Sequence, residues 1–328
     1  MPKETNLNVA PYFDDFTPDS NYYKVLYKPG FPVQARELTT MQSILQDQIE
    51  NMGNHFFKEG AKVIPGSTTF EDDFLGIQIE SEFLGLPVSL YLDQLVGKKI
   101  KGASSGVTAQ VVTYITDEES DRGNFTLYLT YRDAGTSADN ESNEFLDNEV
   151  LQTVEDISFS STFIAAGEGF ASTISSDAPV TGMAYIMAAG VYFLRGHFVD
   201  VKDEVLILDQ YSNTTSHKIG FQIREDIISA DIDPSLSDNA QGFNNFTAPG
   251  ADRLRITATL ARRDIDDVGD ENFIQLTEVI NGGFVGDGVN SDYNFIGDEL
   301  ARRTYDESGN YYCKDFTTTV RECLNDGV

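Results

Sequence analysis

The sequence predicts a mainly β protein with one long N-terminal helix, built as several β-sandwich or barrel-like modules. Apolar residues recur at helical spacing in residues 33–60. After Gly60 this period gives way to β-branched residues that alternate with polar ones, in runs broken by glycine and proline. The chain has 328 residues, of which 40% are hydrophobic, so it can bury a large core and is expected to fold. We therefore expect a multi-domain, mainly β chain.

The predicted helix carries one narrow apolar stripe. Its members are spaced by three or four residues, which places them on one face of a helix, and they are Leu38, Met41, Leu45, Ile49, Met52 and Phe56. Gly53 or Gly60 is expected to end the helix. Gln42, Gln46, Asp47 and Glu50 fall on the other faces and are expected to face solvent. Two interpretations stay open: the stripe packs on the chain's own β-domain, or it forms a seam with further copies of the chain.

An aromatic arm precedes this helix. Residues 11–32 contain four prolines, which exclude a helix interior and favour extended or turn backbone. The aromatic side chains of the arm are too apolar for a free tail and are expected to lie on a surface of this chain or of a neighbour. They are Tyr12, Phe13, Phe16, Tyr22, Tyr23, Tyr27 and Phe31. We treat the arm and the helix as one unit, residues 1–60.

The rest of the chain divides into a main domain and an insertion. Residues 61–94 and 155–328 are assigned to the main β-rich domain. Residues 95–154 contain short alternating runs around the turn at 104–106, and these runs predict a small inserted β-module.

The chain is strongly acidic, with 53 Asp and Glu against 23 Lys and Arg and a formal net charge of −30. Such a chain repels nucleic acids, whose binding depends on cationic groups that release counterions, and it repels anionic membrane surfaces. No run of eighteen apolar residues predicts a membrane span, and the N-terminus lacks the apolar segment of a secretory signal. Neither nucleic acid nor a membrane is therefore expected as a partner.

The two cysteines, Cys313 and Cys323, lie within the last sixteen residues. Their spacing does not predict a zinc site. Free thiols in a reducing cytoplasm are the default expectation, and a disulfide across a hairpin is the alternative.

No motif of the sequence predicts catalysis or a cofactor. Residues 102–106 match the G-x-S-x-G nucleophile elbow, but the β-branched residues that follow favour a hairpin turn over the required helix. The acidic run at 264–271 resembles a calcium loop, yet an EF-hand needs an oxygen side chain where Val268 stands and a glutamate where Gln275 stands. Only a loose Ca²⁺ or Mg²⁺ site stays open there. We expect neither an enzyme nor a bound cofactor.

Several segments together resemble one protein family. They occur in chain order at residues 6–16, 22–66, 237–254 and 299–311. They look like an uncharacterised domain family of tailed-phage virion proteins, common in T4-like phages of cyanobacteria. The positions that match its motifs are expected to have structural roles, and they are Asp238, Asn239, Pro249, Gly250, Asp252, Arg253, Arg302, Arg303 and Asp306.

The resemblance implies a virion structural protein of the baseplate or tail-fibre type, made in the host cytoplasm and carried in the tail. The expected function is an adaptor at the baseplate periphery or fibre base that links a fibre or spike to the tail. Such proteins are often trimers, so the stripe is expected to join three copies of the chain, and the arm to contact a neighbour. The alternative is a receptor-binding adhesin whose loops at 117–124 and 134–143 contact host glycan. A third hypothesis is that the protein is an enzyme that depolymerises glycans.

Overall fold

The fold is that of a computed structural model of the chain, and the residues described are 5–64, 66–135, 143–159, 162–240, 242–267, 269–287, 300 and 302–307. Strands make up 44% of the described residues and helices 15%, and these residues form a single helix of seven or more residues, which confirms the predicted class. The sheets are open, and none closes into a barrel among these residues.

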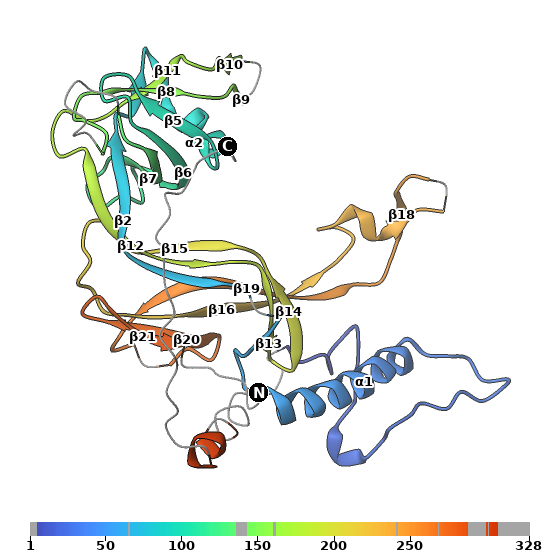
Figure 1. The fold of residues 1–328 in the computed structure, drawn as a ribbon. Helices are drawn as coiled ribbons and strands as arrows, with labels where there is room; N and C mark the ends of the chain where they lie inside the picture. Colours follow the sequence, from blue (N-terminus) through green and yellow to red (C-terminus); the bar gives the residue numbers. More distant parts are fainter. Residues whose placement is uncertain are drawn as a thin grey trace.

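The largest sheet has eight antiparallel strands and runs through two parts of the molecule, here called the upper and the lower body (Figure 1). Its order is β11 (Gly169–Ser172), β8 (Val150–Thr153), β5 (Lys99–Gly102), β6 (Thr108–Ile115), β7 (Phe125–Asp133), β2 (Thr68–Ile79), β12 (Pro179–Met187) and β15 (Glu204–Asp209). Strand β2 pairs with β7 through its last residues and with β12 along most of its length. These two long strands therefore connect the bodies. Residues 95–154 supply β5 to β8 of this sheet.

The upper body encloses its own core. Shorter elements complete it, namely β3 (Glu82–Phe83), β4 (Leu86–Pro87), η2 (Val88–Leu90), α2 (Leu92–Leu95), β9 (Ile157–Phe159) and β10 (Thr162–Ile164). Fully buried side chains at the centre include Ile77, Tyr91, Leu127 and Phe170. The Tyr91 hydroxyl donates a hydrogen bond to the carbonyl of Phe170 at 2.5 Å, so this large side chain is buried without an unpaired polar atom.

The lower body combines two further sheets. One has the order β1 (Lys62–Ile64), β13 (Gly190–Leu194) and β14 (His197–Val201). The other has the order β19 (Arg253–Asp264), β16 (His217–Ile228), β20 (Phe273–Ile280) and β21 (Gly283–Asp287). Side chains from these sheets and from the lower ends of β12 and β15 share one core around Tyr192, Leu194 and Phe221. The lower body is therefore a second packed unit.

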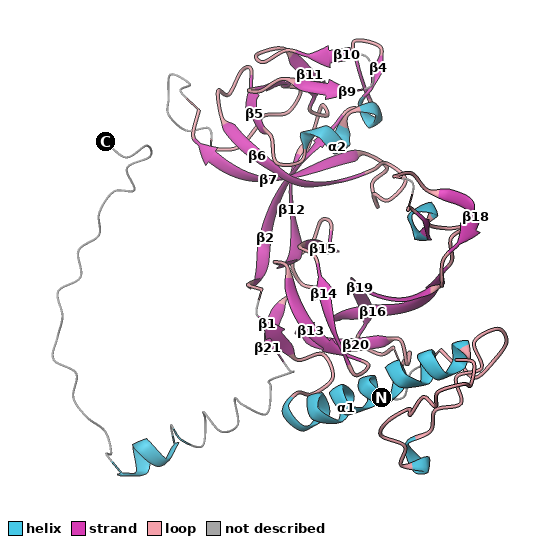
Figure 2. Ribbon diagram, turned by 90° about the vertical axis from the view of Figure 1, so that its right-hand side faces the viewer, coloured by secondary structure: helices cyan, strands magenta, loops and turns pink. Residues whose placement is uncertain are grey.

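A long hairpin leaves the lower body between β16 and β19 (Figures 1 and 2). Those two strands pair without interruption up to Ile228 and Arg253, and residues 229–252 form the excursion. It contains η3 (Pro234–Leu236), β17 (Ser237–Asp238) and β18 (Asn245–Pro249), and β17 and β18 pair only with each other. We call residues 229–252 the 229–252 hairpin.

Helix α1 (Ala35–Phe56) lies at the lower end of the molecule (Figure 2). At its start the Glu37 carboxylate accepts the N–H of Gln34 at 3.0 Å, the return half of a capping box. The helix ends at Phe56, so Gly53 lies inside it and Gly60 four residues beyond. No helix among the described residues combines the length and apolar character needed to cross a membrane.

Candidate interaction surface

Helix α1 contacts the lower body through a small and polar side. Gly53 is buried, and a Cβ at this position would lie 2.3 Å from Cε2 of Phe193, so only glycine allows the helix to approach β13 this closely. The Gln46 side-chain amide donates to the carbonyl of Gly196 at 2.7 Å, and Glu50 lies against the same glycine. Gln42 is exposed as expected, whereas Gln46 and Glu50 are half-buried, because the β13–β14 turn presents polar backbone to this side of the helix.

The first part of the arm covers another side of α1. Asp14 is buried, and its carboxylate accepts hydrogen bonds from the hydroxyls of Thr40, at 3.2 Å, and Ser43. Asp15 forms an exposed ion pair with Arg36 at 3.6 Å. Two sides of the helix are thus engaged by the chain itself, through these polar groups and through the close contact at Gly53, and Ile44 is also buried, at 4% exposed.

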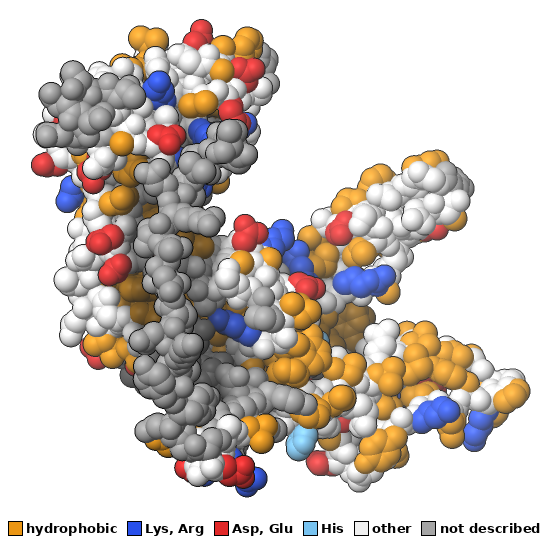
Figure 3. Space-filling model, in the orientation of Figure 1, with side chains coloured by type: hydrophobic (Ala, Val, Ile, Leu, Met, Phe, Trp, Pro, Cys, Tyr) orange, Lys and Arg blue, Asp and Glu red, His pale blue; other side chains and the backbone are white. Residues whose placement is uncertain are grey.

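The predicted apolar stripe lies on the remaining side of α1 and is exposed. The exposed fractions are 47% for Leu38, 38% for Met41, 59% for Leu45, 46% for Ile49 and 66% for Met52, whereas Phe56 is half-buried. Figure 3 shows hydrophobic side chains gathered over this end of the molecule. A contiguous apolar surface of this kind marks an interaction site in a folded protein.

The aromatic arm divides into an attached part and an exposed part. The N–H of Thr5 donates to the Glu225 carboxylate at 3.1 Å, and the Tyr12 hydroxyl donates to the Asp252 carboxylate. The bond to the Asp252 carboxylate raises the pKa of Tyr12. Phe16 is half-buried, whereas the aromatic side chains further along the arm are exposed, as is Phe13. The exposed fractions are 54% for Phe13, 70% for Tyr22, 68% for Tyr23, 45% for Tyr27 and 72% for Phe31.

Six of the motif residues gather in the 229–252 hairpin and at its base, namely Asp238, Asn239, Pro249, Gly250, Asp252 and Arg253. The N–H of Gly250 donates to the carbonyl of Leu236 at 3.0 Å, and a Cβ on Gly250 would lie 2.1 Å from that oxygen. Arg253 donates to the carbonyls of Ala251 and Asp252 at 2.7 and 3.2 Å. These residues hold the hairpin's own turns, and Asp252 also joins the hairpin to the arm through Tyr12.

The other three motif residues lie elsewhere. Arg302, Arg303 and Asp306 belong to a helical turn at 302–307 and have exposed side chains. This turn, drawn in red in Figure 1, lies away from the 229–252 hairpin. The structure therefore does not bring the two groups of motif residues into one site.

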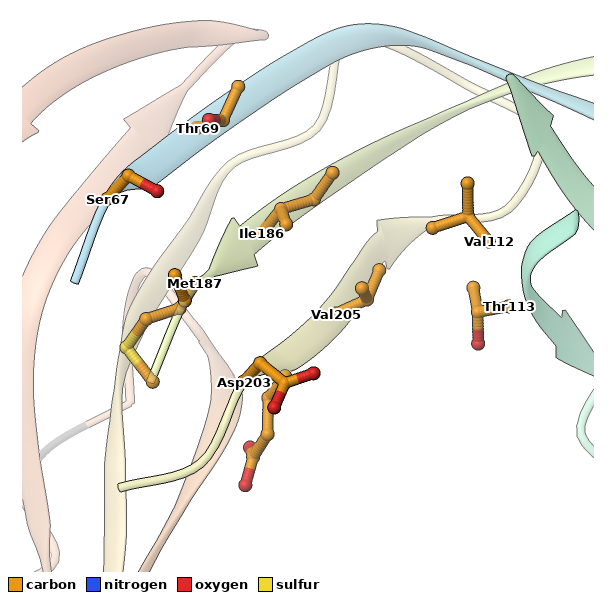
Figure 4. Close-up of a pocket in the computed structure, with 10 residues that line it drawn as sticks. Ser67, Thr69, Val112, Thr113, Ile186, Met187, Asp203 and Val205 are labelled. Atoms are coloured by element: carbon orange, nitrogen blue, oxygen red, sulfur yellow. The ribbon is translucent and has the colours of Figure 1, made fainter. Parts of the chain in front are cut away.

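A surface hollow of about 380 Å³ lies beside β12 and β15, and Figure 4 shows the residues around it. Its walls include Val112, Ile186 and Val205, and Asp203 and Glu204 lie at its rim. The Glu204 carboxylate accepts the N–H of Leu260 at 2.6 Å, which ties β15 to β19. Sequence reasoning did not single out this hollow, because its walls come from strands far apart in the chain.

The motifs that resemble catalytic or metal sites have structural partners. The G-x-S-x-G segment is the turn between β5 and β6, which confirms the predicted hairpin, and Ser105 is buried. The N–H and hydroxyl of Ser105 donate to the Glu149 carboxylate at 2.5 and 3.1 Å. In the acidic run, Asp267 and Asp270 pair with Arg263 at 3.0 and 2.6 Å. The described residues contain no group of three or more side chains able to hold a metal ion.

The adhesin interpretation assigns glycan binding first to the loop at 117–124. Contacts with Gln210 and Tyr211 hold this loop in place. Gln210 bonds both the carbonyl of Glu119, at 2.7 Å, and the N–H of Asp121, at 2.9 Å. The Arg122 guanidinium lies over the ring of Tyr211 at 4.2 Å. Residues 136–142 of the second loop, Val268 and both cysteines lie outside the described residues.

The comparisons with known proteins identify one family. No curated protein matches the chain, and no solved structure matches it. A domain of unknown function, DUF4815, matches residues 10–116 and 134–327. The matched segments include the arm, α1 and the 229–252 hairpin, and together they make up most of the sequence. The chain therefore belongs to the DUF4815 family.

Proposed function

We propose that this protein is a non-enzymatic structural component of a phage tail that assembles with copies of itself through the apolar stripe of α1. Its role is that of an adaptor at the baseplate periphery or tail-fibre base. The observation that carries the self-association is the exposed stripe on a helix whose other sides are already engaged. The assignment to a tail is supported by the resemblance of four segments of the sequence to tailed-phage virion proteins.

Burial of the stripe would favour association. Fully burying an exposed apolar side chain of this kind contributes roughly 1.5–3 kcal/mol, and because the five are about half exposed, their complete burial contributes roughly 4–8 kcal/mol before the costs of association. Those costs are reduced here, because Gly53 packed on Phe193 and the Asp14 hydrogen bonds already hold the helix in place. The narrow seam of alternating three- and four-residue spacing suits a bundle of like helices, and we propose a homotrimer.

Native mass spectrometry of the full chain tests the self-association. We expect wild-type protein to be a trimer at tens of micromolar. The variant Leu45→Glu with Ile49→Glu places two charges in the seam and is expected to be monomeric. Its matched control is Asn51→Glu with Asn54→Glu, which adds the same charge to exposed positions of α1 outside the stripe and should remain trimeric. Circular dichroism verifies that both variants fold.

A wild-type monomer, or equal assembly of the stripe variant and its control, would contradict the proposal. The location in a tail has its own test. Antibodies against the chain, carrying gold particles, should label the tails of purified virions in electron micrographs. Virions that lack the protein would contradict the tail role and would leave the self-association standing.

A further inference from the structure

Two exposed segments of the chain are complementary in charge and in apolar character. Residues 22–28 of the arm contain Lys24 and Lys28 and no acidic residue. The 229–252 hairpin contains four aspartates and no basic residue. A basic segment of this kind is electrostatically complementary to an acidic surface such as the hairpin.

Residues 22–28 have the composition of a strand but no strand partner. The run contains three tyrosines and a valine, residue types that favour β-structure. Leu26 is 74% exposed. Among the described residues, the one backbone hydrogen bond that involves this run is accepted by the Lys28 carbonyl from Phe31, at 3.3 Å. The N–H and C=O groups of the run can therefore pair with the edge of a sheet.

The 229–252 hairpin offers such an edge. Strand β18 pairs only with β17, so its outer edge is open. A two-stranded hairpin is marginally stable in water, and a third strand stabilises it. Its apolar side chains are uncovered, with Ile232 65%, Phe243 64% and Phe246 75% exposed. Like the tyrosines of the arm segment, these side chains are large and apolar or aromatic, so the two sets can pack against each other.

The two segments do not meet within one chain. The bond between Tyr12 and Asp252 joins the base of the arm to the base of the hairpin. From there the two projections diverge, and Figures 1 and 3 show them as separate prongs. The segment that pairs with the edge of β18 must therefore come from a second copy of the chain.

We propose that residues 22–28 of one copy add as a strand to the open edge of β18 in a second copy, with Lys24 and Lys28 facing the aspartates of that hairpin. This inference rests on the proposed self-association, which brings the copies together. Each copy gives its arm to one neighbour and receives an arm from another, and such a head-to-tail contact closes on itself in a ring of three.

Photo-crosslinking tests the contact. A benzophenone amino acid replaces Tyr23 in full-length chains, and ¹⁴N- and ¹⁵N-labelled protein are mixed before irradiation. We expect cross-linked peptides that join residue 23 of one label to residues 243–249 of the other. Cross-links confined to one label, or to surfaces other than the 229–252 hairpin, would overturn the proposal.

Charge reversal makes the test specific. Lys24→Glu with Lys28→Glu should lower the cross-link yield about tenfold, since the attraction between a basic segment and an acidic hairpin becomes a repulsion. Adding Asp231→Lys and Asp238→Lys to the same chain should restore the yield. The control, Lys101→Glu with Lys202→Glu, changes two exposed lysines away from the arm and should leave it unaltered.

Native mass spectrometry of the same samples separates the two proposals. A trimer without the cross-link would overturn the arm contact alone. A monomeric wild-type chain would overturn the arm contact together with the self-association on which it rests.

Discussion

Nη1 of Arg195 lies 2.7 Å from Oε1 of Glu225, and the two side chains are only 4% and 3% exposed. This ion pair lies where the arm, the end of α1 and the lower body meet. The Glu225 carboxylate also accepts the N–H of Thr5, and the N–H of Arg195 donates to the Glu59 carboxylate at 2.5 Å. The guanidinium further bonds the Asn272 side chain. One buried pair thus positions the segments that carry the proposed interaction surface.

Replacing Arg195 with methionine should destabilise the fold strongly. The change leaves Glu225 as a buried carboxylate without its cation, and breaking a buried pair costs about 3–5 kcal/mol. Urea unfolding followed by circular dichroism measures this loss. The control is Arg224→Met, which removes an exposed partner of Asp226 and should change stability little. Equal effects of the two variants would show that the Arg195 pair does not hold the segments together.

Stability should decrease in acid, in part through Glu225. Burial by itself would raise the pKa of Glu225, but the hydrogen bonds from Thr5 and the Arg195 guanidinium outweigh it and lower the pKa below its usual 4.5. A carboxyl whose folded pKa is depressed stabilises the fold above its unfolded pKa, and this contribution is lost as pH falls through the folded value. Urea titrations between pH 7 and pH 3 should show a shallower pH dependence for Glu225→Gln than for wild type. An unchanged slope would contradict the assignment.

Gly53→Ala should weaken the attachment of α1, although alanine favours helices. On propensity alone the change would stabilise the helix by about 1 kcal/mol. The added Cβ, however, would lie 2.3 Å from Cε2 of Phe193, and overpacking of this kind costs about 1–3 kcal/mol. Hydrogen exchange should then be faster across residues 35–56. Asn54→Ala, at the neighbouring exposed position, is the control, and Phe193→Leu should partly rescue the Gly53 variant.

Glu149→Ala should disrupt the turn between β5 and β6. The buried carboxylate accepts the N–H groups of Ser104, Ser105 and Leu146 at 2.7, 2.5 and 2.9 Å. Ser105 is buried, and leaving its donors unpaired costs about 1–3 kcal/mol, so thermal unfolding should shift downward by several degrees. Glu149→Gln keeps an acceptor and should have a smaller effect, whereas Glu144→Ala changes an exposed acid and should have almost none. A melting temperature unaltered by Glu149→Ala would contradict this role.

Much of the architecture is predictable, because its signals are local. The stripe from Leu38 to Met52 follows from spacing within a single helix. The turn at 102–106 follows from the β-branched residues on its C-terminal side. The buried pair of Arg195 and Glu225 was missed, since both are ordinary charged residues in the sequence and meet only when the β13–β14 turn packs against β16.

The amino-acid order alone specifies that α1 has an apolar face and that the chain is mainly β, because periods of 3.6 and 2 residues are properties of neighbouring positions. Which face of α1 meets the body was decided by tertiary contacts. Phe193 and Gly196 lie some 140 residues from Gly53 along the chain, and their close packing admits a glycine and a glutamine amide rather than the apolar stripe. Packing between distant segments thus leaves the apolar stripe of α1 exposed, although such a stripe commonly packs on the chain's own core.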